Sequence, residues 1–155
     1  FPTRRSSDLL QIGVYVAPSY VERLGAPAHP RELENTDHRI VGFLSSRTGK
    51  IDPLVLNGES ERIEITGSYV LAVDDGNAYL EAGLAGLGVI ALPVYMAAAH
   101  QACGSLIPLF ENWRIDPMPL YLAFPPNRHV NVKLRVFIDW IVELMQQHVP
   151  TSTHK

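Results

Sequence analysis

Two stretches of the sequence place polar residues directly after an apolar run, and this arrangement suits the binding of a small molecule. The first is FLSSRTG, at the end of the predicted strand 39–45, and the second is VDDGNAYL, at the end of the predicted strand 68–73. Ligands of open α/β sheets bind beyond the carboxyl ends of strands, where the free N–H groups of a following helix favour an anion. The same residues also suit ordinary caps without a ligand. The residues alone leave both interpretations open.

No residue pattern predicts catalysis, a metal site or a cofactor. The single cysteine, Cys103, excludes an internal disulfide, and we expect a buried or half-buried, unreactive thiol near a helix end. The six histidines lack metal-ligand spacing, and no GxSxG elbow occurs. GLAGLG has the glycines of a dinucleotide fingerprint in the reverse context, since it closes a helix and leads into a strand. Gly83, Gly86 and Gly88 are therefore predicted to permit close helix–sheet packing and to form a C-cap.

The composition is that of an ordinary globular protein. Of the 155 residues, 46% are hydrophobic and 19% are charged, and the formal net charge is −3. Lys and Arg do not cluster, so this stretch is not expected to bind nucleic acid by itself. The uncharged run 82–99 is long enough to cross a membrane, but it is rich in Gly and Ala and contains Pro93. We interpret it as a helix end, a buried strand and another helix, with no membrane partner.

Strand and helix signals alternate along the chain, which predicts an α/β fold with a largely parallel sheet. Expected strands are 10–17, 39–45, 68–73, 89–93, 106–110 and 119–125, and NGES is the expected turn of a hairpin. The run 68–73 is predicted to be covered on both faces. Expected helices include one with Ser19 as N-cap and Gly25 beyond its end, and one capped by Asp74 or Asp75. In the last helix, an apolar stripe is expected at Val130, Leu134, Phe137, Ile141 and Leu144.

Four phrases together carry a family resemblance. They are VAPSYVERLGAPAHPRELENTDHRIVGF, VDDGNAYLEAGLAGLGVIALPVYMAAAH, the pattern G-x-L-I-P-L-F-E-x-W, and PLYLAFPPNRHVNVKLRVFIDWIVELM. In this order and spacing the chain, from about Leu10 to Gln146, resembles the C-terminal effector-binding domain of LysR-type transcriptional regulators. Each phrase is modestly specific, whereas the complete series is strongly so.

The resemblance implies an α/β fold like that of type 2 periplasmic binding proteins, in which two lobes joined by two crossing strands enclose a cleft. The crossing strands are expected at 10–17 and 118–125, one complete lobe at 18–117, and a C-terminal helix of the other lobe at 126–149. The rest of that lobe and the N-terminal helix-turn-helix are expected to be missing by truncation, and 150–155 to be a disordered tail. The opening string FPTRRSSDL resembles a translated sequencing adapter, so residues 1–9 are predicted to be an artefactual tail.

The resemblance implies that the chain senses an unknown small-molecule effector in a cytoplasmic regulator and that it is not an enzyme. The intact regulator is expected to be a homodimer or homotetramer that binds DNA only through its helix-turn-helix. Asp74 and Asp75 argue against a simple carboxylate pocket unless both serve as caps. The alternative hypothesis is a periplasmic solute-binding protein of a transporter. The predicted cleft residues are Phe43, Leu44, Ser45, Ser46, Val73, Asp74, Asp75 and Asn77, with Val16, Pro18 and Tyr121 at the hinge or cleft floor.

Overall fold

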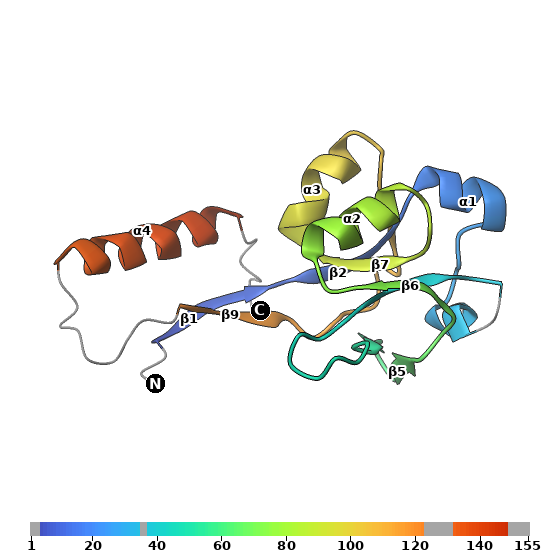
Figure 1. Ribbon diagram of the computed structural model, residues 1–155, viewed down its shortest axis with the longest axis horizontal. Coiled ribbons are helices and arrows are strands. Elements are labelled where there is room, and N and C mark those ends of the chain that lie inside the picture. The colour runs from blue at the N-terminus through green and yellow to red at the C-terminus, as the bar shows by residue number, and fades with distance from the viewer. Residues whose placement is uncertain (1–3, 35–36, 123–131, 149–155) are drawn as a thin grey trace. The chain divides into compact units, whose positions relative to one another are not determined.

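The computed structural model describes residues 4–34, 37–122 and 132–148 (Figure 1). The chain divides into two compact units. The larger unit is Ile12–Asp116, and the smaller unit combines Phe1–Gln11 with Pro117–Lys155. Both stretches that the sequence singles out for ligand binding lie in the larger unit.

The centre of the larger unit is strand β2 (Ile12–Val16), which is buried over its second half. It pairs antiparallel with β7 (Ile90–Pro93) on one side and with β8 (Ile107–Leu109) on the other. A second pair, β3 (Ile40–Phe43) and β6 (Tyr69–Val73), is parallel. The chain therefore contains two adjoining pieces of sheet, which meet at the start of β7.

The junction is an isolated parallel bridge between Ile40 and Val89. Through it, β6, β3 and β7 run in one direction, while β2 runs antiparallel to β7. The prediction of a largely parallel sheet was wrong, because β2 pairs antiparallel with both of its neighbours and makes the sheet mixed. The alternation of strands and helices along the chain was predicted correctly.

Helices cover one face of the sheet, and a hairpin covers the other (Figure 1). The helices are α2 (Gly76–Leu84) and α3 (Val94–Ala102). The hairpin, which was predicted, consists of β4 (Leu54–Asn57) and β5 (Arg62–Ile65), which pair antiparallel. Asn57, expected with Gly58 at the centre of the turn, is instead the last residue of β4 and is paired with Arg62. The larger unit thus has three layers, with the sheet in the middle.

Side chains of β2 alternate between the two buried layers. Val14 and Val16 pack in an apolar cluster with the hairpin, while Tyr15 packs in the cluster that contains α2 and α3. This alternation is the period-two geometry of a strand, and it makes β2 the strand that is covered on both faces. The hairpin-side cluster also takes in Tyr20 of α1 (Pro18–Leu24) and Leu33 of the 3-10 helix η1 (Pro30–Glu34).

The glycines of GLAGLG allow α2 to lie close to the sheet, as predicted. A side chain on Gly83 would collide with Ile90 of β7, and a Cβ on Gly88 would lie 2.9 Å from the carbonyl oxygen of Arg39. Gly86 follows the C-cap of α2 with φ +71°, which favours glycine. The carbonyl of Gly86 accepts a hydrogen bond from Arg23 of α1.

Two local predictions for the larger unit were wrong. Strand β6 is not covered on both faces, since Val70 and Leu71 are 41% and 39% exposed. The cause is its edge position, because β3 is its one strand partner among the described residues. Helix α1 begins two residues earlier than predicted, with Ala17 in place of Ser19 as N-cap and Pro18 at the first helical position, where its fixed φ is favourable.

The smaller unit contains an antiparallel strand pair and one helix. Strand β1 (Arg4–Leu10) pairs with β9 (Met118–Leu122), and Gln11 separates β1 from β2 where the sequence predicted one strand over 10–17. A strand therefore occupies most of the stretch 1–9, whose predicted artefactual origin stays a prediction. The end of the crossing strand after residue 122 and the tail 150–155 lie outside the described residues.

The helix of the smaller unit is α4 (Val132–His148). Among the residues of α4 whose burial is described, Ile138 is buried, at 6% exposure, whereas Phe137 of the predicted stripe is 50% exposed. The predicted stripe therefore has the right period but includes Phe137 in place of its neighbour. Val130 lies outside the described residues. Within the described ranges, no helix combines the length and the apolarity that a membrane crossing requires.

Candidate functional site

The two stretches with predicted ligand-binding residues meet at adjacent strand ends. In the parallel register of β3 and β6, Phe43 is paired with Val73. The backbone N–H of Leu44 donates to the carbonyl of Val73 at 2.8 Å, one residue beyond the end of β3. Residues 43–46 and 73–77 therefore leave the same edge of the sheet side by side. We call these nine residues the tip site.

The chain after β3 forms a tight turn that fixes one half of the tip site. The N–H of Ser45 donates to the carbonyl of Lys50 at 2.9 Å, and the N–H of Gly49 donates to the carbonyl of Ser45 at 2.8 Å. Ser45 is half-buried and Ser46 is exposed. Within the described part of the chain, neither hydroxyl has a recorded hydrogen-bond partner, so both are free to bind a ligand.

The other half of the tip site is the start of α2, where Asp75 is the N-cap, as predicted. Its Oδ1 accepts hydrogen bonds from the N–H groups of Asn77 at 3.0 Å and Ala78 at 2.9 Å. The cap carboxylate thus occupies the N–H groups that would otherwise favour an anion. Asp74 is exposed, and no partner for its carboxylate is recorded among the described residues. Only one of the two aspartates is therefore used as a cap.

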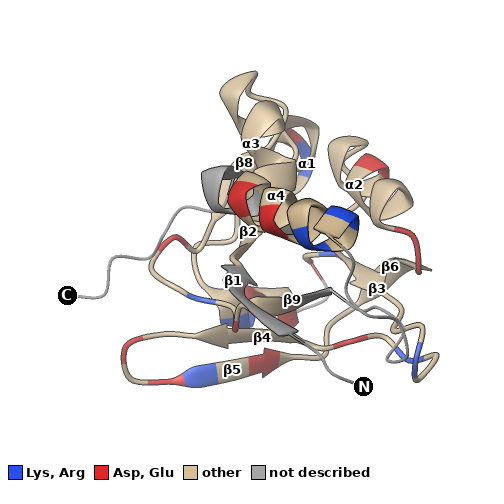
Figure 2. Ribbon diagram, turned by 90° about the vertical axis from the view of Figure 1, so that its left-hand side faces the viewer, with Lys and Arg blue, Asp and Glu red and all other residues tan. Residues whose placement is uncertain are grey.

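Charges of both signs surround the tip site. Asp74 and Asp75 form an acidic segment between β6 and α2, visible in Figure 2, while Arg47 and Lys50 are exposed in the turn after β3. A simple carboxylate pocket is disfavoured on the acidic side, and the two cations offer hydrogen-bond donors on the other. The tip site suits a polar ligand with separated donor and acceptor groups.

The strand 89–93 and the helix after it were predicted from the sequence, but the end of this strand was not considered as part of a site. Strand β7 runs parallel to β3 and ends at Pro93, and α3 begins at the next residue. No side chain caps the free N–H groups at the start of α3. The sequence did contain a signal for this strand end, because VIALP is followed directly by a helical pattern. A strand that leads into a helix without a loop places the N-terminus of that helix at the carboxyl end of the strand.

Tyr79 was also missed, although it lies behind the tip site. Its ring meets the ring of Phe43 edge to face, with centroids 5.4 Å apart and an interplanar angle of 81°. Its hydroxyl oxygen accepts the backbone N–H of Ala91 at 3.0 Å. Tyr79 is 6% exposed, and burial raises the pKa of its hydroxyl to about 12, although the Ala91 hydrogen bond acts in the opposite direction.

The hydroxyl of Tyr79 marks the place where β3 and β7 separate. Val41 donates its N–H to the carbonyl of Val89 at 3.0 Å, which is the last backbone bond recorded between the two strands. The next N–H of β7 on that side, from Ala91, goes to Tyr79 instead of to β3. The two strands therefore diverge toward their carboxyl ends, as strands do at a ligand crevice.

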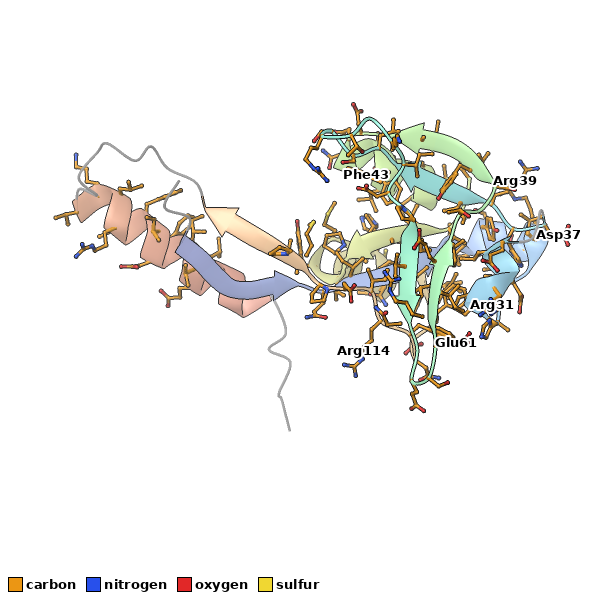
Figure 3. All side chains as sticks on the ribbon, turned by 90° about the horizontal axis from the view of Figure 1, so that it is seen from below. Arg31, Asp37, Arg39, Phe43, Glu61 and Arg114 are labelled. Carbon is orange, nitrogen blue, oxygen red and sulfur yellow. The ribbon has the colours of Figure 1, made fainter. Side chains whose placement is uncertain are left out.

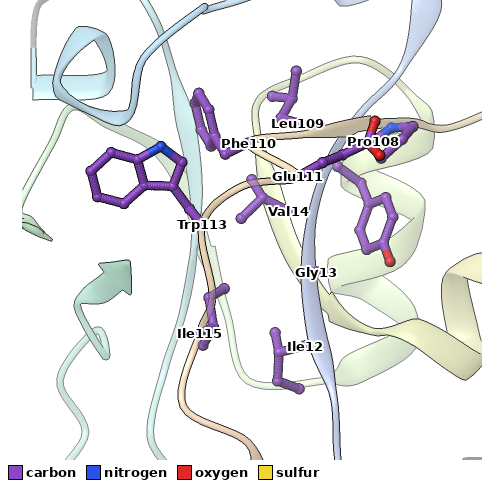
Figure 4. Close-up of a pocket in the computed structure, with 10 residues that line it drawn as sticks. Ile12, Gly13, Val14, Pro108, Leu109, Phe110, Glu111, Trp113 and Ile115 are labelled. Carbon is purple, nitrogen blue, oxygen red and sulfur yellow. The ribbon is translucent and has the colours of Figure 1, made fainter. Parts of the chain in front are cut away.

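The larger unit contains two cavities near these strands. One, of about 310 Å³, is lined by β3, β4, β6 and β7 together with Ile115 and Asp116; we call it the inner cavity. The other, of about 250 Å³, lies between the start of β2 and the segment 108–115 (Figure 4). None of the nine tip-site residues lines either cavity. The tip site is thus an open surface at the edge of the sheet.

Two of the predicted hinge residues, Val16 and Pro18, lie elsewhere in the larger unit. Val16 is fully buried in the apolar cluster on the hairpin side, and Pro18 is half-buried at the first position of α1. Tyr121 belongs to β9 in the smaller unit, and its side chain lies outside the described part of the structure. Of the eleven predicted residues, eight are therefore close together, and Figure 3 shows Phe43 at this edge.

Other reactive side chains lie away from the tip site. Cys103 is exposed at the C-cap of α3, so its predicted burial was wrong and its position at a helix end was right. A hydrogen bond with the Ser105 hydroxyl, at 3.1 Å, lowers the pKa of its thiol. Arg31 and Glu61 form an exposed ion pair at 2.8 Å between η1 and the hairpin (Figure 3). No group of three potential metal ligands occurs among the described residues.

Comparisons with known proteins find a family model and relatives that are transcriptional regulators. A family model described as the LysR substrate binding domain matches residues 10–146. The HTH-type transcriptional repressor PA14_22550 of Pseudomonas aeruginosa is 24% identical over 139 residues, which are 90% of this chain and 43% of that protein. The regulator YcaN of Escherichia coli, an uncharacterized HTH-type transcriptional regulator, is 30% identical over 132 residues, or 85% of this chain and 42% of that protein. The chain spans less than half of each.

Solved structures agree with the sequence comparison in fold. The regulatory domain of CrgA, a LysR-type regulator from Neisseria meningitidis, aligns with 92% of this chain and 68% of its own, at a TM-score of 0.75 and 24% identity. The regulatory domain of a C227S variant of AphB from Vibrio vulnificus aligns with 91% of this chain and 68% of its own, at a TM-score of 0.73 and 22% identity. Regulatory domains of this kind have the type 2 periplasmic-binding-protein-like α/β fold, and so has this chain. By the match over residues 10–146, the chain belongs to the LysR substrate-binding domain family.

Proposed function

We propose that the chain is the effector-sensing part of a LysR-type transcriptional regulator and that the tip site binds the effector. The unit Ile12–Asp116 then corresponds to one complete lobe of the two-lobed fold. The family match and the curated relatives, which are named as HTH-type regulators, support the regulatory role. The adjacency of Phe43 and Val73 supports the position of the site.

The main support for the site is the pairing of these two strand ends at the point where the order of strands in the sheet changes direction. β6 lies on one side of β3, and after α2 the chain returns as β7 on the other side of β3. Ligands of doubly wound sheets bind at such a switch point, beyond the carboxyl ends of the strands. The free hydroxyls of Ser45 and Ser46 and the carboxylate of Asp74 lie there.

The proposed mechanism requires binding and no catalysis. An effector changes the output of a regulator only if it binds one arrangement of the protein more tightly than another. In the intact regulator, DNA is bound through a helix-turn-helix domain, and the protein is a cytoplasmic homodimer or homotetramer. Val16, Pro18 and Tyr121 are proposed to lie at the hinge between the two lobes.

The second candidate function, a solute-binding protein of a transporter, uses the same fold. The relatives favour the regulator, because they are HTH-type transcriptional regulators and not binding proteins. Recovery of the complete reading frame that contains this chain separates the two. A helix-turn-helix in that frame supports the regulator, and a secretory signal in its place contradicts it.

The test of the site uses the complete regulator and a reporter gene under its operator. Ser45→Trp and Ser46→Trp place a large side chain at the tip site, and Ser60→Trp is the control, since Ser60 is exposed in the hairpin turn. Both tip variants are expected to raise the effector concentration for half-response by about tenfold or more, with operator binding unchanged. An unchanged response in both tip variants would contradict the site.

A further inference from the structure

The inner cavity has the size and composition of a small-molecule site. Its volume of about 310 Å³ is roughly twice the ~150 Å³ that accommodates benzene in an apolar cavity. Its walls are mainly aliphatic, with contributions from Ile40, Leu54, Val55, Val89 and Ile115. Ligand pockets combine such walls with a few polar groups that fix orientation. All of its lining residues belong to the larger unit.

One polar group inside the inner cavity is available to a ligand. Tyr79 and Ala91 both line the cavity, and the hydroxyl oxygen of Tyr79 accepts the N–H of Ala91, while no acceptor for the hydroxyl's own proton is recorded among the described residues. Tyr79 is 94% buried, so this unused donor is shielded from bulk water. A buried donor without an acceptor is costly, and a ligand oxygen at this point would remove the cost.

The charged groups that line the inner cavity are both acidic. Asp52 and Asp116 are exposed lining residues, and no Lys or Arg lines the cavity. Asp116 accepts a hydrogen bond from the side-chain amide of Asn57 at 3.0 Å, while no partner for the Asp52 carboxylate is recorded among the described residues. The cavity therefore carries a negative charge at its solvent side, which favours a cation and disfavours a carboxylate.

We propose that the inner cavity binds an arylalkylamine with a hydroxyl group on its ring. The ring occupies the aliphatic interior, the oxygen of the ring hydroxyl accepts a hydrogen bond from the Tyr79 hydroxyl, and the ammonium group lies near Asp52 and Asp116. This site is distinct from the tip site, because the two share no residue. Within the larger unit, the ligand would fill the space where β3 and β7 diverge.

The chain offers a direct way to fill the inner cavity. Ala91 lines it, and its neighbours Ile90 and Leu92 both point into the cluster with α2 and α3. Because side chains alternate along a strand, the methyl group of Ala91 faces the opposite side, toward the cavity. Ala91→Leu therefore occupies ligand space. Ile12→Phe is the matched control, since Ile12 lines the other cavity and not this one.

The test is calorimetric titration of the 155-residue chain with four probes of similar shape. They are tyramine, its carboxylate counterpart 4-hydroxyphenylacetate, phenethylamine without the hydroxyl, and uncharged 4-ethylphenol. We expect tyramine to bind about tenfold or more tightly than the acid, and phenethylamine to bind more weakly than tyramine. Ala91→Leu should lower the affinity for tyramine by about tenfold or more, and Ile12→Phe should leave that affinity unchanged. Asp52→Asn should lower the affinity for tyramine and leave the affinity for 4-ethylphenol unchanged.

Several results would overturn this proposal and leave the proposed function standing. They are the absence of binding by tyramine up to its solubility limit, equal affinity for tyramine and the acid, and full affinity in an Ala91→Leu protein with a native circular dichroism spectrum. Loss of tyramine binding in Ser46→Trp with retention in Ala91→Leu would place the amine at the tip site and would also refute the inner cavity. The reporter assay with Ser45→Trp tests the proposed function separately.

Discussion

Removal of the Tyr79 hydroxyl tests whether β3 and β7 are held apart as the structure shows. In Tyr79→Phe the ring and its contact with Phe43 are kept, while the N–H of Ala91 loses its acceptor. An unpaired, partly buried N–H costs about 1–2 kcal/mol. For a chain of this size, that corresponds to a fall in melting temperature of roughly 3–6 °C.

The same variant changes the response to alkaline pH, and the direction follows from the raised pKa. In the unfolded chain Tyr79 loses its proton near the ordinary value of 10.0, whereas in the folded protein its pKa is about 12. The folded state therefore holds the proton more tightly, so stability is fully present below pH 10 and is lost as the pH rises from 10 to 12. The loss reaches about 3 kcal/mol, since each pKa unit corresponds to ~1.4 kcal/mol.

The assay is urea unfolding followed by circular dichroism at pH 8 and at several values between 10 and 12. Tyr95→Phe is the control, because Tyr95 is 46% exposed on α3. We expect Tyr79→Phe to be less stable than the native chain at pH 8 and to lose less stability above pH 10. The reasoning is refuted if Tyr79→Phe matches the native chain at pH 8 and shows the same alkaline decline.

Three further predictions concern α2 and α4. Asp75→Ala should lower the free energy of unfolding by about 1 kcal/mol through loss of the N-cap, whereas Asp74→Ala should change it by less than about 0.5 kcal/mol; equal urea midpoints for the two would contradict the cap. Gly86→Ala should lower the free energy of unfolding by about 1 kcal/mol or more, because φ is positive at this position and the added Cβ would collide with Ser19. Gly76→Ala, where a Cβ meets no atom, serves as the control in the same urea experiment. We expect the 155-residue chain to self-associate through the apolar side chains of Phe137 and Trp140 on α4, which are at least half exposed, and Phe137→Lys with Trp140→Lys should reduce this self-association in light scattering; an unchanged mass distribution would exclude this face of α4 as the cause.

Local patterns predicted the positions of most elements in the larger unit. The helix cap at Asp74 or Asp75, the hairpin around NGES and the role of the GLAGLG glycines each depend on a few neighbouring residues, and each was predicted, although Asn57 lies in a strand and not at the centre of the turn. The adjacency of the two strand ends also followed from the order of strands and helices, because parallel neighbours end at the same edge.

Features that depend on distant neighbours were not predictable in this way. The apolar run of β6 has the composition of a strand covered on both faces, and only its edge position explains the exposure of Val70 and Leu71. Helical period alone does not decide between Phe137 and Ile138, since both lie near the centre of the stripe. The contact of Tyr79 with Ala91 depends on the divergence of β3 and β7, for which the sequence has no local signal.

The most direct test of the tip site is hydrogen–deuterium exchange on the complete regulator, with and without the effector that induces it. The account predicts slower amide exchange in peptides covering 43–50 and 73–80 when the effector is present, and unchanged exchange in the hairpin 54–65. Protection that leaves both of the first two peptides unchanged, while other segments respond, would contradict it.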